Sequence, residues 1–195
     1  MELILASASP RRRELLSRFG LDFTVMAAQA DETLLPGLTP QQQVLRLSEI
    51  KASAVRDSLP HRPGQVIISA DTIVVLDGEI LGKPKDEAQA KAMLSALSGR
   101  AHLVLTGVTV LSETEQKQIC EETQVFFRAL TASEISAYVR SGEPMDKAGA
   151  YGIQGFGSLF VEKIIGDYYN VMGLPLCHLG QLLRQMGISI LEATL

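Results

Sequence analysis

The sequence predicts a mixed α/β fold, in which helices flank a sheet that has both parallel and antiparallel strand pairs. Short apolar runs typical of buried strands alternate with helical patterns through the first half of the chain. Two longer stretches of alternating polarity then follow one another around a polar turn, as in an antiparallel pair. With 195 residues, 46% of them hydrophobic, the chain can bury a substantial core without disulfides.

The first elements are predicted from local start and stop signals. Residues 3–6 form a short apolar strand, and a helix follows with Ser9 as its cap, Pro10 in its first turn and Gly20 at its end. A second strand is predicted over residues 23–27. Thr39-Pro40-Gln41-Gln42 is a capping box that begins a helix extending to residue 58.

The remaining elements continue the alternation. An apolar strand over residues 66–70 ends on Asp71, and residues 72–81 form a hairpin around Asp77-Gly78. The other predicted elements are a helix over 86–99, strands over 102–111 and 119–128, a helix over 131–142, a glycine-rich loop, a strand over 159–164 and a helix over 175–186.

Composition excludes several classes of protein. A net charge of -4, 5% aromatic residues and no tryptophan argue against a protein that binds nucleic acid polymers. No apolar run approaches the roughly 20 residues of a membrane span, and the N-terminus lacks the order of a signal peptide. Cys120 and Cys177 are predicted to be free thiols in a reducing compartment. We therefore expect a cytoplasmic protein without a membrane partner.

The segment LILASASPRRRELL gathers three arginines at the start of a helix. Cations at a helix N-terminus are disfavoured by roughly 0.3–1 kcal/mol each. An anion bound there would reverse that penalty, with Ser7 and Ser9 donating from hydroxyls and Arg11 and Arg12 from guanidinium groups. The alternative is an ordinary capped helix with solvated arginines. The spacing does not match a P-loop.

Two acids and three lysines are further candidates. Asp71, at the end of a buried strand, could hold a divalent metal or accept a proton from water, and Glu32 could bind the same metal. The alternatives are a turn aspartate and an exposed loop acid. Lys51, Lys83 and Lys147 lie beside small or apolar residues, although each alone is more typical of a solvated surface.

The segment YGIQGFG is the last candidate. Its glycines could allow the backbone and Gln154 to approach a ligand, although a plain loop explains them nearly as well. The segment precedes a strand and does not open a helix, which argues against a dinucleotide-binding fingerprint.

The order of these motifs resembles the Maf family of nucleoside triphosphate pyrophosphatases, in the blocks LILASASPRRRELL, ADET, LRLSEIKA, SADTIVVLDGEILGKP, ALSGRAHLVLTGV, VFFRALTASEISAYV and DKAGAYGIQGFGSLFVEKIIGDYYNVMGLPL. The resemblance covers nearly the whole chain and implies a single domain over residues 1–195. It further implies a twisted central sheet, two lobes with a cleft between them, and a homodimer. The implied reaction cleaves a nucleoside triphosphate between the α and β phosphates, with Mg²⁺ or Mn²⁺ as cofactor.

The resemblance also implies roles for individual residues. Ser7, Ser9, Arg11 and Arg12 match the family's phosphate-binding run. Glu32 and Asp71 match its metal-binding carboxylates, Asp71 is its proton acceptor, and Lys51 and Lys83 match its phosphate-facing lysines.

Three positions distinguish branches of the family. They are Arg11, Thr72 and Gln154 here, whereas the branch resembling 7-methyl-GTP pyrophosphatases has Trp, Gln and Glu. Gln154 offers a donor and an acceptor, which suits O4 and N3–H of thymine or uracil. The resemblance therefore favours hydrolysis of dTTP and UTP, with modified pyrimidine nucleotides as further candidates. The alternatives are a nucleotide-sensing regulator of septum formation and a member selective for another base, such as 7-methyl-GTP.

Overall fold

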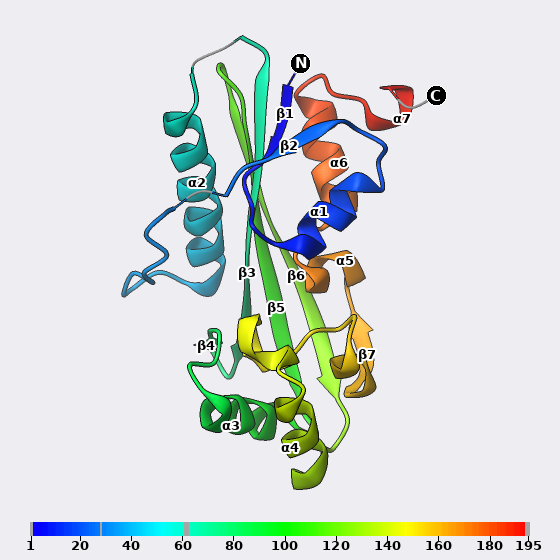
Figure 1. Cartoon of the computed structure of the whole chain (residues 1–195). Helices are drawn as coiled ribbons and strands as arrows, with labels where there is room; N and C mark the ends of the chain where they lie inside the picture. Colours follow the sequence, from blue (N-terminus) through cyan, green and yellow to red (C-terminus); the bar gives the residue numbers. More distant parts are fainter. Residues whose placement is uncertain (1, 28, 61–62, 194–195) are drawn as a thin grey trace. The chain divides into compact units, whose positions relative to one another are not determined.

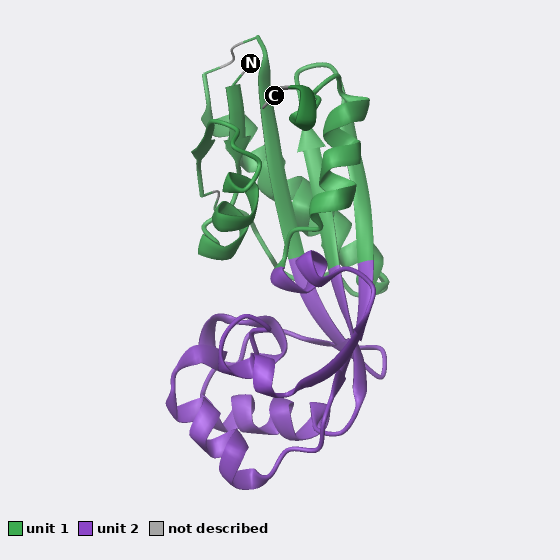
Figure 2. Cartoon of the chain, turned by 90° about the vertical axis from the view of Figure 1, so that its right-hand side faces the viewer, with its two compact units in different colours: residues 1–71, 106–121, 173–195 green, residues 72–105, 122–172 purple. Residues whose placement is uncertain are grey.

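The computed structural model describes residues 2–27, 29–60 and 63–193. The chain divides into two compact units (Figure 2). Unit 1 comprises Met1–Asp71, Thr106–Glu121 and Gly173–Leu195, and unit 2 comprises Thr72–Leu105 and Glu122–Met172. The single domain, and the cleft between two lobes, stay predictions.

One mixed sheet of seven strands confirms the predicted α/β class. Its order is β2-β1-β3-β5-β6-β7, and β4 pairs with β3. The strands are β1 (Glu2–Leu5), β2 (Phe23–Val25), β3 (Gln65–Leu76), β4 (Glu79–Leu81), β5 (Ala101–Leu111), β6 (Gln116–Phe127) and β7 (Val161–Ile165). β1 is parallel to both β2 and β3, with Leu3 opposite Phe23 and Val66. The β3–β4 and β6–β7 pairs are antiparallel.

Helices cover both sides of the sheet in unit 1 (Figure 1). α2 (Pro40–Ser58) lies on one side, and α1 (Pro10–Ser17) and α6 (Leu176–Gln185) lie on the other. Ala52 and Val55 of α2 pack with Ile4 and Ile67 of the strands. The predicted caps are present, since the Ser9 hydroxyl accepts from Arg12 N–H and Thr39 and Gln42 form the capping box.

Unit 2 contains α3 (Glu87–Leu97), α4 (Ala132–Arg140) and α5 (Tyr168–Met172), with short 3₁₀ turns over Glu143–Asp146, Ala148–Ala150 and Phe156–Leu159. Its core includes Tyr138, Tyr151 and Phe160. Buried His102 accompanies them, with its ring 5.3 Å from that of Tyr151. Aromatic rings packed edge to face supply both apolar burial and orientation.

The structure corrects the predicted end of one strand. β3 continues through Asp71 as far as Leu76, so Asp71 lies within a strand and not at its carboxyl end. A polar residue is tolerated there because Lys51 pairs with it.

Four further elements differ from the prediction. β2 stops at Val25, two residues early, and β7 begins at Val161 because Phe156–Leu159 form a 3₁₀ turn. α5 and α7 (Ile190–Ala193) span five and four residues, too few to show helical periodicity. Among the described residues, no helix is long and apolar enough to cross a membrane.

Candidate active site

The junction between β1 and α1 turns three polar groups toward one another. Ser7 is 7% exposed, and its hydroxyl accepts from Ser9 N–H at 3.2 Å and from an Arg12 Nη at 3.4 Å. Ser9 caps the helix, at 3.5 Å from Arg12 N. The residues predicted to grip phosphate thus lie together at this helix start, where backbone N–H groups favour an anion.

Arg12 occupies a different setting from its two neighbours. Its Nε donates to the Gly173 carbonyl at 2.7 Å. Burial lowers the pKa of Arg12, and Arg11 lowers it further, whereas the carboxylates of Asp71 and Glu32 raise it. The charge of Arg12 therefore acts on the two acids predicted to take part in the chemistry.

Lys51 connects both acids. Its Nζ lies 2.6 Å from Asp71 Oδ1 and 3.0 Å from Glu32 Oε2. The Lys51 and Asp71 side chains are 14% and 11% exposed, whereas that of Glu32 is 56% exposed. Lys51, Asp71, Glu32 and Arg12, named here the charged quartet, come from four separate segments of unit 1 and balance in formal charge.

The position of Lys51 depends on how α2 meets the sheet. A β-carbon at Gly107 would lie on the Val44 carbonyl and 2.8 Å from Leu45 N, so the α2 backbone rests directly on β5. Gly107 was not predicted from the sequence, although an isolated glycine within a strand is a signal of close backbone approach.

A small polar ladder reinforces this docking. The Ser48 hydroxyl lies 2.8 Å from Thr109 Oγ1, and the Ser69 hydroxyl donates to the Ser48 carbonyl at 2.5 Å. Ser48 precedes Lys51 by one helical turn, and Ser69 precedes Asp71 by two residues on β3, so the ladder holds the two partners in register.

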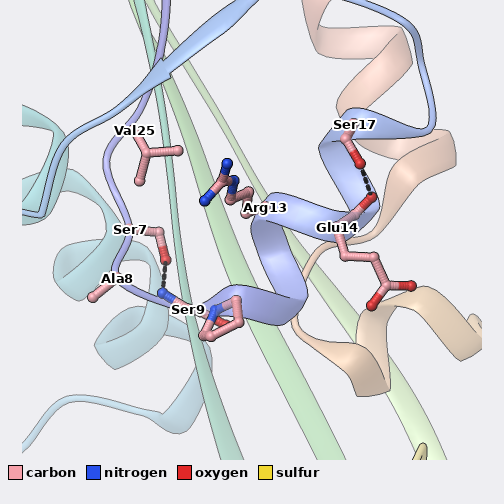
Figure 3. A pocket seen from close by; sticks show the side chains of 8 residues that line it. Ser7, Ala8, Ser9, Arg13, Glu14, Ser17 and Val25 are labelled. Atoms are coloured by element: carbon pink, nitrogen blue, oxygen red, sulfur yellow. Dashed lines mark hydrogen bonds between the residues drawn. The ribbon is translucent and has the colours of Figure 1, made fainter.

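A groove of about 460 Å³ opens beside α1 (Figure 3). It is lined by Ser7, Ala8, Ser9, Pro10, Arg13, Glu14, Ser17 and Val25. The third arginine of the run, which was not predicted to bind phosphate, therefore faces open space on the same side as Ser7 and Val25. Arg11 is half-buried.

The other predicted residues belong to unit 2. Lys83 and Gln154 are exposed and Thr72 is half-buried on β3. Lys147 is 13% exposed, where its Nζ donates to the Glu143 carbonyl at 2.7 Å and pairs with Asp146 at 2.6 Å. These contacts indicate that Lys147 stabilises the 3₁₀ turn of Glu143–Asp146 that precedes it. The roles of Lys83, Thr72 and Gln154 stay predictions.

The acids of the quartet fit a hard divalent cation. Mg²⁺ is usually bound by one or two carboxylates, with substrate phosphates and water completing its shell. Asp71 and Glu32 supply two such carboxylates around one point, now occupied by Lys51 Nζ. Among the residues that the structure describes, no group of three or more His, Cys, Asp or Glu side chains forms a metal cage. The two carboxylates suit a metal that also binds a phosphate ligand.

Comparisons with known proteins agree over nearly the whole chain. The family model described as Maf-like protein matches residues 2–186. A protein of Bacillus pumilus named dTTP/UTP pyrophosphatase is 48% identical and covers 96% of this chain and 98% of its own. Proteins of the same name from Geobacillus sp. and Methanosarcina barkeri are 50% and 49% identical, covering 95% and 98% of this chain and 98% and 97% of their own.

Solved structures are more distant. A nucleoside-triphosphatase, titled dITP/XTP pyrophosphatase, from Mycobacterium abscessus is 16% identical, with a TM-score of 0.45 over 95% of this chain and 94% of its own. A likeness at that level is too weak to bear on function.

Proposed function

The chain belongs to the Maf family, and on that premise we propose that it hydrolyses dTTP and UTP to the monophosphate and pyrophosphate. The observation that carries the proposal is the charged quartet, in which Lys51 Nζ lies within 3.0 Å of two carboxylates whose charges act on Arg12, at the start of the helix that is predicted to bind phosphate. The names of relatives at 48–50% identity support the choice of substrates.

Each member of the quartet has a chemical task in this reaction. Water attacks the α-phosphorus, the bond from that phosphorus to the bridging oxygen breaks, and the attacking water loses a proton. Asp71 accepts that proton, because a carboxylate held by a cation on one side can still bind a proton from water. Lys51 and Arg12 stabilise charge that moves onto the leaving pyrophosphate.

A divalent cation, Mg²⁺ or Mn²⁺, is part of the proposal for an electrostatic reason. Arg12 and Lys51 carry two positive charges, and Asp71 and Glu32 carry two negative ones, so the quartet alone cannot neutralise a triphosphate with about four negative charges. A metal held by Asp71 and Glu32 would supply the missing charge and polarise the phosphate oxygens. Arg11, Ser7, Ser9 and Lys83 are proposed as further phosphate contacts.

Base selection is proposed to depend on Arg11, Thr72 and Gln154. Gln154 is exposed and can both donate and accept, as the O4 and N3–H edge of thymine and uracil requires. Modified pyrimidine nucleotides that keep this edge are expected to be substrates too.

The test is a panel of nucleoside triphosphates incubated with Mg²⁺ or Mn²⁺, with pyrophosphate and single phosphate measured separately. We expect pyrophosphate release from dTTP and UTP. Asp71→Asn should abolish that release while the circular dichroism spectrum stays that of the native fold, because the substitution keeps the size of the side chain and removes its basicity. Turnover in Asp71→Asn equal to that of the native chain would contradict the proposal.

The alternatives give different results in the same panel. Saturable nucleotide binding without any product would indicate the nucleotide-sensing regulator of septum formation. Preferred hydrolysis of 7-methyl-GTP would indicate a member selective for another base.

Two properties of the whole protein complete the proposal. We propose a cytoplasmic location, because two widely separated cysteines, Cys120 and Cys177, are the pattern expected of a protein in a reducing compartment. We also propose a homodimer, on the resemblance to the family alone. Sedimentation analysis of the purified chain tests the second.

A further inference from the structure

The loop of residues 152–157 carries Gln154, and an acidic side chain together with the tyrosine that donates to it holds this loop on both sides of Gln154. Glu143 Oε2 accepts the Phe156 N–H at 2.9 Å, and its Oε1 lies 3.3 Å from the Gly157 N. On the other side, Gly152 N–H donates to the Tyr138 hydroxyl at 3.2 Å, and that hydroxyl donates to Glu143 Oε1 at 2.9 Å. Three backbone amides around Gln154 therefore end on one Glu143–Tyr138 pair.

The glycines of the loop are explained by the same pair. A β-carbon at Gly155 would lie 2.5 Å from Glu143 Cδ, and one at Gly157 would lie 3.0 Å from the Tyr138 hydroxyl. The backbone can approach the carboxylate closely only because these positions lack side chains. Glu143 itself is half-buried, whereas Gln154 is exposed.

The supporting tyrosine is fixed in the core of unit 2. Tyr138 is 4% exposed and packs edge to face on Phe160, with ring centroids 4.9 Å apart. Burial raises the pKa of Tyr138, and the Glu143 carboxylate raises it further, so the hydroxyl stays protonated and keeps donating. The rigid core is thus linked to the exposed loop through one carboxylate.

We propose that Glu143 is a positioning residue for base recognition, which holds the 152–157 loop in the conformation that presents Gln154 to the nucleobase. The inference rests on the proposed function, and it assigns to Glu143 no contact with the substrate. Amide-to-base hydrogen bonds are sensitive to placement, because a group displaced by about 1 Å can lose about 100-fold in rate.

Glu143→Gln is the sharpest perturbation. The amide keeps the shape of the side chain, but only one of its two polar atoms can accept a hydrogen bond. Its NH₂ group must therefore face donors on one side, either the Phe156 N–H or the Gly157 N–H and the Tyr138 hydroxyl, and those hydrogen bonds are lost. Tyr138→Phe is the second variant, since it keeps the ring packing and removes the hydroxyl.

Glu134→Gln is the matched control. Glu134 is also half-buried in unit 2, and its carboxylate accepts from Arg128 and from the Thr131 N–H and hydroxyl, at 2.7 to 2.9 Å. It completes the capping box of α4, and none of these hydrogen bonds reaches the loop. Its loss should cost stability without changing base selection.

The readout is the ratio of kcat/KM for dTTP to kcat/KM for dCTP, together with the inhibition constant of tripolyphosphate, which has no base. We expect Glu143→Gln and Tyr138→Phe to lower the ratio by about 10-fold or more. The tripolyphosphate constant should stay at its native value, and amide hydrogen exchange at residues 152–157 should accelerate. An unchanged ratio, or an equal loss in Glu134→Gln, would overturn the inference.

Binding separates this inference from the proposed function. The same nucleotides are competed against one another in equilibrium binding at each variant. If the native chain binds dTTP without hydrolysing it, the proposed reaction fails, whereas a binding ratio lowered only by Glu143→Gln and Tyr138→Phe would still support the positioning role. A native chain that binds no nucleotide would overturn both.

Discussion

The contact between Gly107 and α2 predicts that a single methyl group, placed more than one helical turn from Lys51, disables the site. In Gly107→Ala the new β-carbon meets the backbone of Val44 and Leu45, and backbone cannot rotate away as a side chain can. Moving Leu45 N from 2.8 Å to the 3.4 Å of an ordinary contact requires a displacement of at least about 0.6 Å, and the Val44 carbonyl, which is closer still, requires more. α2 must therefore retreat from β5 and take Lys51 with it.

The expected cost follows from this displacement. Overpacking of a tight contact costs about 1–3 kcal/mol of unfolding free energy. The pair between Lys51 Nζ and Asp71 Oδ1, now 2.6 Å apart, should open by a similar distance. We expect turnover of dTTP to fall by about 10-fold or more. Urea denaturation and pyrophosphate release measure the two effects.

Gly180→Ala is the control for Gly107→Ala. It makes the same substitution within α6 of the same unit, where the nearest atom to a new β-carbon is Ile190 Cδ1 at 3.9 Å. Alanine is favoured over glycine inside a helix by about 0.5–1 kcal/mol, so this variant should gain stability and keep its turnover. If Gly107→Ala matches Gly180→Ala in both measurements, the docking argument is wrong.

Two further predictions concern buried cationic or titratable groups. Arg12→Lys keeps the charge, but one ammonium nitrogen replaces the two guanidinium nitrogens that donate separately to the Gly173 carbonyl and to Ser7. Arg12→Lys should therefore lose more stability in urea and more turnover than Arg11→Lys, and the reverse order would contradict this role. Burial lowers the pKa of His102 to about 4, whereas the unfolded chain protonates it near pH 6.5. Between these values the unfolded state binds more protons, so His102 by itself should lower the free energy of unfolding by about 3 kcal/mol from pH 7 to pH 4. Urea denaturation at several pH values should show that the free energy of unfolding depends less on pH in His102→Gln than in the native chain. An equal pH dependence in the two chains would refute the role of His102.

Helix starts could be predicted from the sequence because their signals are local. Ser9, Thr39, Asp86 and Thr131 each accept from a backbone N–H three residues along the chain, so the cap and the group it satisfies lie in one short segment. The type and order of the main elements follow from such signals together with apolar periodicity.

The continuity of β3 could not be predicted in this way. Asp71-Thr72 interrupts an apolar run, and locally such a break indicates the end of a strand. The strand continues because Lys51, twenty residues earlier, supplies the partner that a nearly buried carboxylate needs. That partner is defined only when α2 has docked, and the docking depends on Gly107 and on the Ser48–Thr109 contact.

In the candidate site, too, some residues could be predicted from the sequence, whereas others depend on contacts between distant parts of the chain. The acids and cations of the charged quartet were identified from their residue types and from the resemblance, because charged groups near apolar runs are conspicuous in a sequence. Glu143 was missed, because nothing near it in the sequence distinguishes it from a surface acid that begins a turn. Its importance arises from two backbone amides that reach it across 13 and 14 residues of chain, and from a third that reaches its hydrogen-bond partner Tyr138.

Three adjacent arginines are tolerated because their side chains lie in different environments. Arg12 turns inward, where the Gly173 carbonyl, Ser7 and the nearby charges of Asp71 and Glu32 compensate its partial burial. Arg13 lines the open groove beside α1. The fold itself therefore relieves the repulsion on Arg12. The charges of Arg11 and Arg13 are the ones that an anionic ligand would balance. A phosphate bound at this helix start should accordingly raise the stability of the native chain, and this effect should weaken with added salt because Arg13 is exposed to solvent and Arg11 is only half-buried.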